Sequence, residues 1–181
     1  AKIPVLTGDH DVVSMMSYGY DPYLSTWSPY HGAIYAVTES VAKIVAMGGN
    51  YKTIRFSFQE YFEKLLNNPI KWGKPFAALL GAYKAQAALK LPSIGGKDSM
   101  SGSFEDLDVP PTLVSFAITA GDAKDVVTPE LKGFGHKLVE VCVNKDEYHV
   151  FDFEDLMSKY DVVSNLIKDG KVYSAYTVKD G

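Results

Sequence analysis

Two hydrophobic periods alternate along this chain, and the alternation sets its fold class. Residues 12–18 and 112–120 are rich in apolar and β-branched side chains, which is typical of strands. Between them, apolar residues recur at helical spacing near residues 34–45 and again near residues 76–87. Chains that alternate strands and helices pack the helices against a sheet, so we expect an α/β or α+β fold.

Turn and cap residues predict where these elements end. Gly48 and Gly49 end the first helix in the usual C-terminal way, and Pro92 ends the second. Pro75 suits the first turn of the second helix, because the N–H that proline lacks is not needed there. Further elements are expected as a strand at 51–58, a short helix at 60–67, a strand at 136–144, a helix at 152–168 and a strand at 171–178.

The chain is expected to contain one whole domain and the beginning of another. We place the first domain at residues 1–121 and a linker at residues 122–135, where proline and glycine interrupt the pattern. Residues 136–181 are too few to close a hydrophobic core of their own. They would therefore form a partial C-terminal domain.

Charge and cysteine content argue against several classes of protein. The 181 residues carry a net charge of −4, whereas proteins that grip nucleic acid through its phosphates need a basic surface. No apolar run approaches the roughly 18 residues of a membrane span, and the N-terminus has no hydrophobic signal core. Cys142 is the single cysteine, and its apolar neighbours predict a buried strand residue. We expect a cytoplasmic protein whose partners are neither nucleic acid nor membrane.

The sharpest local feature is a glycine-flanked segment that could hold phosphate. Its residues are Gly95, Gly96, Lys97, Asp98 and Ser99. Glycines let backbone N–H groups turn toward an anion, Lys97 could offset phosphate charge, and Asp98 could hold Mg²⁺. The order is not that of a P-loop. A tight structural turn explains the same residues, so both interpretations stay open.

One further pair is a candidate, and no catalytic set is evident. Glu39 on the first helix could ligate a metal or a nucleotide. Lys43 follows four residues later, so the two could equally form an ordinary helix-surface pair. The four histidines lack metal-ligand spacing, and the sequence contains no nucleophile motif. We therefore assign no catalytic residue.

Several short segments are informative through their shared order and spacing. They are Gly8–Ser14 (GDHDVVS), Ser28–Ala33 (SPYHGA), Thr38–Lys43 (TESVAK), Phe58–Leu65 (FQEYFEKL), Trp72–Pro75 (WGKP), Ile94–Phe104 (IGGKDSMSGSF) and Asp108–Phe116 (DVPPTLVSF). Together they resemble the phosphoribosylformylglycinamidine synthase family in its long single-chain form. The resemblance covers residues 8–120 well and becomes weaker toward the C-terminus.

This resemblance implies the second of two aminoimidazole-ribonucleotide-synthetase-like halves. The chain would contain an N-terminal domain of that superfamily and the truncated start of its C-terminal α/β domain. The complete enzyme uses ATP, Mg²⁺ and glutamine to convert formylglycinamide ribonucleotide to formylglycinamidine ribonucleotide. Its catalytic motif and its glutamine amidotransferase nucleophile lie in other parts of the enzyme. The chain would thus be an auxiliary or structural half, partnered by the remaining domains of the same enzyme chain.

The resemblance also implies site residues, with two departures. Glu39 and Asp98 would share Mg²⁺, but related second halves often have Asn or Asp where this chain has Lys43. A charged lysine cannot ligate a cation, so Lys43 could act as a built-in counter-ion to Glu39. The family's C-terminal His-Asp-x-Ser-Asp-Gly pattern is YTVKDG here, at residues 176–181. The residues expected near ATP or ADP are Gly95, Gly96, Lys97, Asp98, Ser99 and Lys43.

Two alternative functions stay open, and the resemblance also implies how the chain would assemble. The chain could be a non-catalytic module that only completes a β-barrel with the first half. It could also be a relative of the selenophosphate or thiamine-phosphate kinases, although those proteins carry clusters of metal-binding aspartates. The N-terminal domains of this superfamily bury a sheet face by pairing, so an isolated copy would expose that face. We therefore expect a homodimer through the strands at 12–18 and 112–120.

Overall fold

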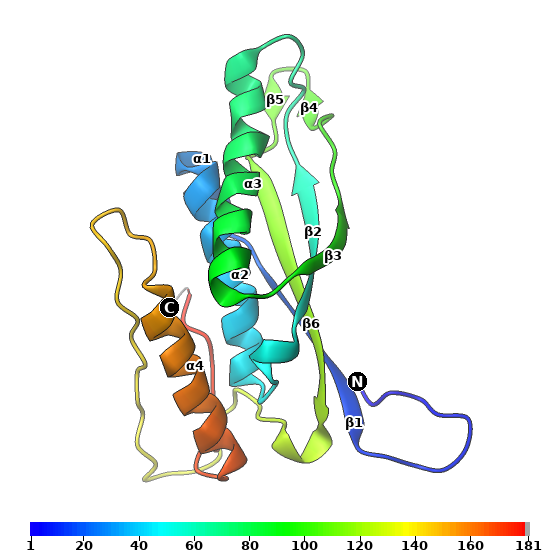
Figure 1. The fold of residues 1–181 in the computed structure, drawn as a ribbon, viewed down its shortest axis with the longest axis vertical. Helices are drawn as coiled ribbons and strands as arrows, with labels where there is room; N and C mark the ends of the chain where they lie inside the picture. Colours follow the sequence, from blue (N-terminus) through cyan, green and yellow to red (C-terminus); the bar gives the residue numbers. More distant parts are fainter. Residues whose placement is uncertain (180–181) are drawn as a thin grey trace.

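The computed structural model describes residues 1–179 and shows helices layered on one sheet (Figure 1). The elements are β1 (Val12–Gly19), α1 (Pro22–Trp27), α2 (Pro29–Ala46), the 3-10 helix η1 (Tyr51–Thr53), β2 (Arg55–Tyr61), α3 (Pro69–Leu89), β3 (Ser93–Lys97), β4 (Ser103–Phe104), β5 (Leu107–Asp108), β6 (Thr112–Asp122), the 3-10 helix η2 (Ala123–Asp125) and α4 (Phe153–Lys168). Helices α2 and α3 lie on one face of a four-stranded sheet, and α4 packs beside α2. The hairpin β4–β5 extends from one end of the molecule.

The sheet has the strand order β1-β6-β2-β3. β6 lies between β1 and β2 and is antiparallel to both, whereas β2 and β3 are parallel. Parallel neighbours need a crossover connection, and α3 provides it. The pairing places Gly19, Ser115, Phe58 and Gly96 in one row across all four strands. Gly19 on β1 and Gly96 on β3 therefore lie at opposite edges of the sheet, three strand spacings apart.

Capping side chains set where the helices begin. Asp21, Ser28 and Asn68 accept hydrogen bonds from backbone N–H groups in the first turns of α1, α2 and α3. A proline is the first helical residue in each of these helices, a position where its missing N–H costs nothing. None of the helices in residues 1–179 is long and apolar enough to cross a membrane.

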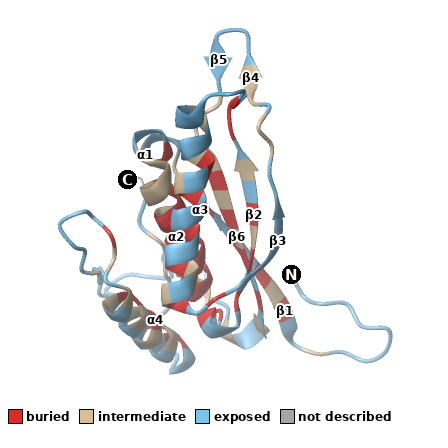
Figure 2. Ribbon diagram, turned by 45° about the horizontal axis from the view of Figure 1, so that its top comes forward, coloured by how far each residue is buried: buried red, intermediate tan, exposed pale blue. Residues whose placement is uncertain are grey.

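The hydrophobic core lies between the sheet and the two helices that cover it (Figure 2). Gly81 lets α3 approach α2 closely, since a Cβ there would lie 2.1 Å from the carbonyl oxygen of Tyr30. The buried hydroxyls of Ser40 and Ser115 bond to each other at 2.9 Å and join α2 to β6. Large, fully buried side chains include Phe56, Phe62, Ile34, Ile44, Ile54, Val37 and Val41.

The opposite face of the sheet presents apolar side chains to solvent. Side chains alternate along β1, so Met15 is buried while Met16 and Tyr18 are 64% and 56% exposed. Ile118 on β6 pairs with Met16 and is also exposed. These are the two strands expected to contribute to a dimer. The dimer itself stays a prediction.

The strongest periodic elements are confirmed, namely the strands at 12–18 and 112–120 and the helices at 34–45, 76–87 and 152–168. The strand expected at 51–58 begins only at Arg55, because Asn50 caps a turn of 3-10 helix before it. The helix expected at 60–67 was a wrong prediction. Glu60 belongs to β2, and the N–H of Phe62 continues the pairing by donating to the carbonyl of Ser99 at 2.9 Å.

Two other boundaries differ from expectation for local reasons. α3 begins at Pro69 rather than at Pro75, because the Asn68 side chain caps the N–H groups of Ile70 and Lys71. Pro75 therefore lies inside the helix. The segment expected as a loop from Gly95 begins instead as strand β3, paired with β2.

The region after the sheet was predicted least well. Strands expected at 136–144 and 171–178 do not form, and Cys142 is exposed rather than buried. A strand needs a partner for its backbone groups, but between residues 126 and 179 the pairing is limited to one bridge, Lys145 with Phe151. α4 still packs, since Leu156 and Tyr160 join the core cluster. The division at residues 121 and 136 stays a prediction.

Candidate functional site

The predicted site residues form two groups at opposite edges of the sheet. Glu39 lies over Gly19 on β1, at one end of the row across the strands, and Gly96 on β3 lies at the other end. Three strand spacings separate the two ends, which amounts to about 14 Å. Ligands of one Mg²⁺ ion lie about 2.1 Å from it. The structure therefore does not bring Glu39 and Asp98 to a single ion within one chain.

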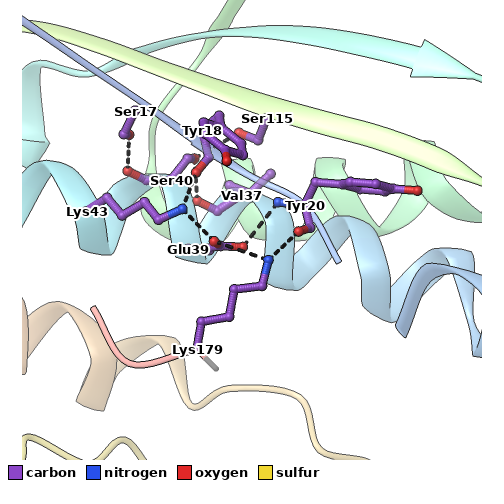
Figure 3. A network of polar contacts seen from close by, with 9 residues as sticks. All are labelled: Ser17, Tyr18, Tyr20, Val37, Glu39, Ser40, Lys43, Ser115 and Lys179. Carbon is purple, nitrogen blue, oxygen red and sulfur yellow. Dashed lines mark hydrogen bonds and ion pairs between the residues drawn. The ribbon is translucent and has the colours of Figure 1, made fainter. Parts of the chain in front are cut away.

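Glu39 is the centre of a polar cluster that we call the Glu39 cluster: Glu39, Lys43, Lys179 and the backbone of Tyr18 and Tyr20 (Figure 3). Lys43 Nζ donates to Glu39 Oε1 at 2.6 Å, and the N–H of Tyr20 donates to Glu39 Oε2 at 3.1 Å. Lys179 Nζ lies 3.6 Å from Glu39 Oε1 and donates to the carbonyl of Tyr20 at 2.5 Å. The carboxylate is only 13% exposed. Two ammonium groups thus surround one largely buried carboxylate.

Lys43 is fixed by more than its ion pair. Its Nζ also donates to the carbonyl of Tyr18 at 2.9 Å and lies 4.5 Å from the centre of the Tyr18 ring. The helix beneath is held by hydroxyls, because Ser17 Oγ donates to the carbonyl of Ser40 at 2.6 Å (Figure 3). The predicted pairing of Lys43 with Glu39 is therefore present, and contacts with Tyr18 support it.

The Glu39 cluster does not fit Mg²⁺. That ion takes oxygen ligands in a near-octahedral arrangement, whereas two lysine nitrogens occupy the space around Glu39. The carbonyls of Tyr18 and Tyr20, which could ligate a cation, already accept hydrogen bonds from these lysines. Within residues 1–179 no group of three or more His, Cys, Asp or Glu side chains is placed to hold a metal ion.

The second group lies on β3 and in the segment that follows it. A Cβ on Gly96 would lie 2.4 Å from the carbonyl oxygen of Phe58, so glycine is needed there for close approach of β3 to β2. Gly95 has open space around it. Lys97 is exposed, and its Nζ lies 3.4 Å from the carbonyl of Asp98. The roles of Gly95 to Ser99 toward phosphate stay predictions.

Glu60 is a charged residue of this region that the sequence did not single out. It lines a recess of about 220 Å³ with Phe58, Leu79 and Gly95 to Asp98. Glu60 Oε1 is buried and has no hydrogen-bond partner within residues 1–179. Burial, and then the charge of Asp98, raise the pKa of Glu60 from 4.5 to about 7. The alternation of β2 could have indicated that Glu60 shares a face with buried Phe58.

Lys179 is the other functional candidate that sequence reasoning did not assign. It belongs to the YTVKDG segment, whose last two residues lie outside the described part of the chain. Its position against Glu39 depends on the path of the chain after α4, which no local pattern encodes.

Helices on one face of a mixed sheet define this chain as a mixed α/β protein, which confirms the expected α/β (α+β) class. The sequence matches no protein-family model and no curated protein. Among solved structures, it is similar to phosphoribosylformylglycinamidine synthase II from Thermotoga maritima. That likeness has a TM-score of 0.69 at 18% identity and covers 90% of this chain and 25% of the other.

The same likeness extends to a nucleotide complex of that protein. PurL of T. maritima complexed with ATP gives a TM-score of 0.69 at 18% identity, covering 91% of this chain and 26% of the other. The chain thus spans about a quarter of the length of these structures. At this identity the likeness shows a shared fold.

Proposed function

We propose that this chain is part of a phosphoribosylformylglycinamidine synthase and forms its auxiliary or structural half. The observation that supports this most is the extent of the fold likeness to PurL, which covers 90% of the chain. The resemblance of ordered segments over residues 8–120 supports it independently. The complete enzyme would be the ATP- and glutamine-dependent ligase that makes formylglycinamidine ribonucleotide, in the cytoplasm, with Mg²⁺ and a glutamine amidotransferase domain elsewhere in the enzyme.

The Glu39 cluster favours an auxiliary rather than a catalytic role. An active ATP site of such a ligase would hold Mg²⁺, and the donor set around Glu39 does not fit that ion. PurL of T. maritima has been solved with ATP, ADP and formylglycinamide ribonucleotide, so related folds do bind nucleotides. In this chain a nucleotide would meet Lys97 and the Gly95–Ser99 segment, without the metal.

Calorimetry with ADP tests this role. We expect weak binding that does not change when Mg²⁺ is added, and a loss of that binding in Lys97→Met. Lys84→Met is the matched control, because Lys84 is an exposed lysine on α3 away from the recess. Tight ADP binding that requires Mg²⁺ in the unmodified chain would contradict the auxiliary role.

An activity assay tests the other half of the proposal. The pure chain should form no formylglycinamidine ribonucleotide from formylglycinamide ribonucleotide, ATP and ammonia. Measurable turnover that depends on all three would place the active site in this chain.

A second candidate function is a structural module that pairs sheet faces and binds no nucleotide. The exposed apolar face around Met16, Tyr18 and Ile118 favours it, since such a face promotes association. Sedimentation should then show a dimer that becomes a monomer in Met16→Lys. Ile70→Lys, at an exposed apolar position on α3, is the control and should stay dimeric. A monomer at high concentration would exclude pairing through this face in the isolated chain.

A further inference from the structure

The segment after α4 returns to the body of the molecule without forming a strand (Figure 1). The side-chain hydrogen bonds and ion pairs of residues 172–179 come from Ser174 and Lys179 within the described chain. Ser174 Oγ donates to the carbonyl of Glu130 in the long connection before α4. Lys179 alone among these reaches α2 and the end of β1. Within the described chain, the polar side-chain contacts of this segment with α2 and the end of β1 thus come from one lysine.

The contacts around Glu39 can be compared with those that a divalent cation would make. A divalent cation beside Glu39 would bring two positive charges and would bind oxygens of the carboxylate and of nearby carbonyls. Lys43 and Lys179 together bring two positive charges and bind those same groups, Glu39 and the carbonyls of Tyr18 and Tyr20. The N–H of Tyr20 satisfies the remaining carboxylate oxygen. The cluster is complete without a metal.

We propose that Lys43 and Lys179 take the place of a divalent cation at Glu39, and that Lys179 thereby straps residues 171–179 across the end of β1. Lys179, a residue of the same chain, covers Glu39, so a ligand that binds Glu39 must first displace Lys179. The two lysines have different tasks: Lys43 is held by its own helix and by Tyr18, whereas Lys179 connects elements that are distant in sequence. The strap is present whether or not the chain binds a nucleotide.

The burial of Glu39 explains why the strap is held. An ion pair on an open surface contributes little, because solvent and salt screen it. Glu39 is largely buried, so removing its lysines would leave a carboxylate without compensation. Holding Lys179 in place satisfies this carboxylate and the carbonyl of Tyr20 together.

NMR relaxation on the whole chain tests the strap. Backbone order parameters at residues 175–178 should be above about 0.8 in the unmodified chain and fall below about 0.6 in Lys179→Met. Lys171→Met is the matched control, since Lys171 pairs with Asp169 at the end of α4 and not with the sheet layer. Glu39→Gln should mobilise the same residues, which provides a second variant should one of them fold poorly. Unchanged order in Lys179→Met would overturn the strap.

Magnesium itself tests the replacement. The unmodified chain should show no saturable heat with MgCl₂ in calorimetry. The double variant Lys43→Asn, Lys179→Asp should give a saturable heat, with an affinity for Mg²⁺ at least tenfold above the highest that the data allow for the unmodified chain. The Lys171→Asp variant should behave as the unmodified chain does. Binding of Mg²⁺ by the unmodified chain that shifts the NMR signals of Glu39 would overturn the replacement, as would a double variant that folds but gains no affinity.

Discussion

At the scale of single residues, two adjacent glycines have different roles. Gly96 is confined by the carbonyl of Phe58, whereas Gly95 faces open space. Neither glycine has the positive φ that would require glycine for conformational reasons. Packing therefore requires glycine at position 96 but not at position 95. A predicted phosphate contact at Gly95 can be tested without disturbing the packing of β3 on β2.

We expect Gly96→Ala to destabilise the protein by about 1–3 kcal/mol, because its methyl group meets backbone rather than a movable side chain. Gly95→Ala should be neutral or slightly stabilising, since it lowers the entropy of the unfolded chain. Urea unfolding of the two variants measures the difference. Equal stabilities would mean that β3 moves away from β2 at little cost.

Glu60 gives a pH-dependent prediction. Its pKa of about 7 in the folded protein exceeds its ordinary value of 4.5, so the folded state binds this proton more tightly than the unfolded state does. The resulting stability is fully present below pH 4.5 and is lost as the pH rises through 7. In Glu60→Gln this loss should be absent, which makes the variant more stable than the unmodified chain by about 1–2 kcal/mol at pH 8.

Urea unfolding at several pH values between 4.5 and 8 measures this dependence. Asp106→Asn is the control because Asp106 is an exposed carboxylate in the turn between β4 and β5. The raised pKa would be refuted if the Glu60→Gln and Asp106→Asn variants lost stability with the same slope.

Local spacing predicted some of these residue environments and not others. The pairing of Lys43 with Glu39 followed from their separation of four positions on a helix. The contact of Lys179 with Tyr20 joins residues 159 positions apart and depends on the whole fold. The burial of Glu60 depends on α3 covering β2, which the charge of the residue argues against on its own.

At the scale of elements, hydrophobic periodicity identified the helices and strands that pack in the core. Whether the other segments form strands depends on backbone pairing. α2 was recognisable because its apolar positions face the core along its whole length. β3 was not recognisable, since all five of its residues are exposed and two are glycines, so it has no alternating pattern. The segment at 136–144 has the composition of a strand but pairs with none within residues 1–179. Backbone pairing is a property of two segments, and one segment's sequence cannot supply it.

The crossing of α2 and α3 gives an element-scale prediction. Gly81→Ala should destabilise the protein by about 2 kcal/mol or more, because its Cβ would press on the carbonyl of Tyr30 in α2. Gly73→Ala in the same helix meets nothing within 4 Å and should stabilise by up to about 1 kcal/mol through helix propensity. Thermal unfolding measures both, and a stabilising Gly81→Ala would show that the helices separate freely.

At the scale of the whole molecule, the open point is whether α4 folds with the sheet layer or apart from it. The sequence suggested a boundary before α4, because proline and glycine interrupt the pattern at residues 122–135. In the structure α4 uses the core of the first region instead. Tyr160 is buried against Tyr51, and its hydroxyl donates to the carbonyl of Thr38 at 3.2 Å. Burial raises the pKa of Tyr160, so it remains a neutral donor.

We therefore expect residues 1–179 to unfold in one cooperative transition that includes α4. Both tryptophans, Trp27 and Trp72, lie in α1 and α3, so their fluorescence reports on the sheet layer while circular dichroism also reports on α4. The two signals should coincide in urea. Tyr160→Ala should shift both by about 3–5 kcal/mol, because it empties a buried aromatic position.

The exposed Tyr176→Ala should shift neither signal. If circular dichroism changed before fluorescence, and Tyr160→Ala moved only the early step, α4 would belong to a separate unit, and the predicted boundary after residue 121 would hold. Coincident shifts would instead make α4 part of the first domain, because a side chain from α4 would then stabilise strands that it does not follow in sequence.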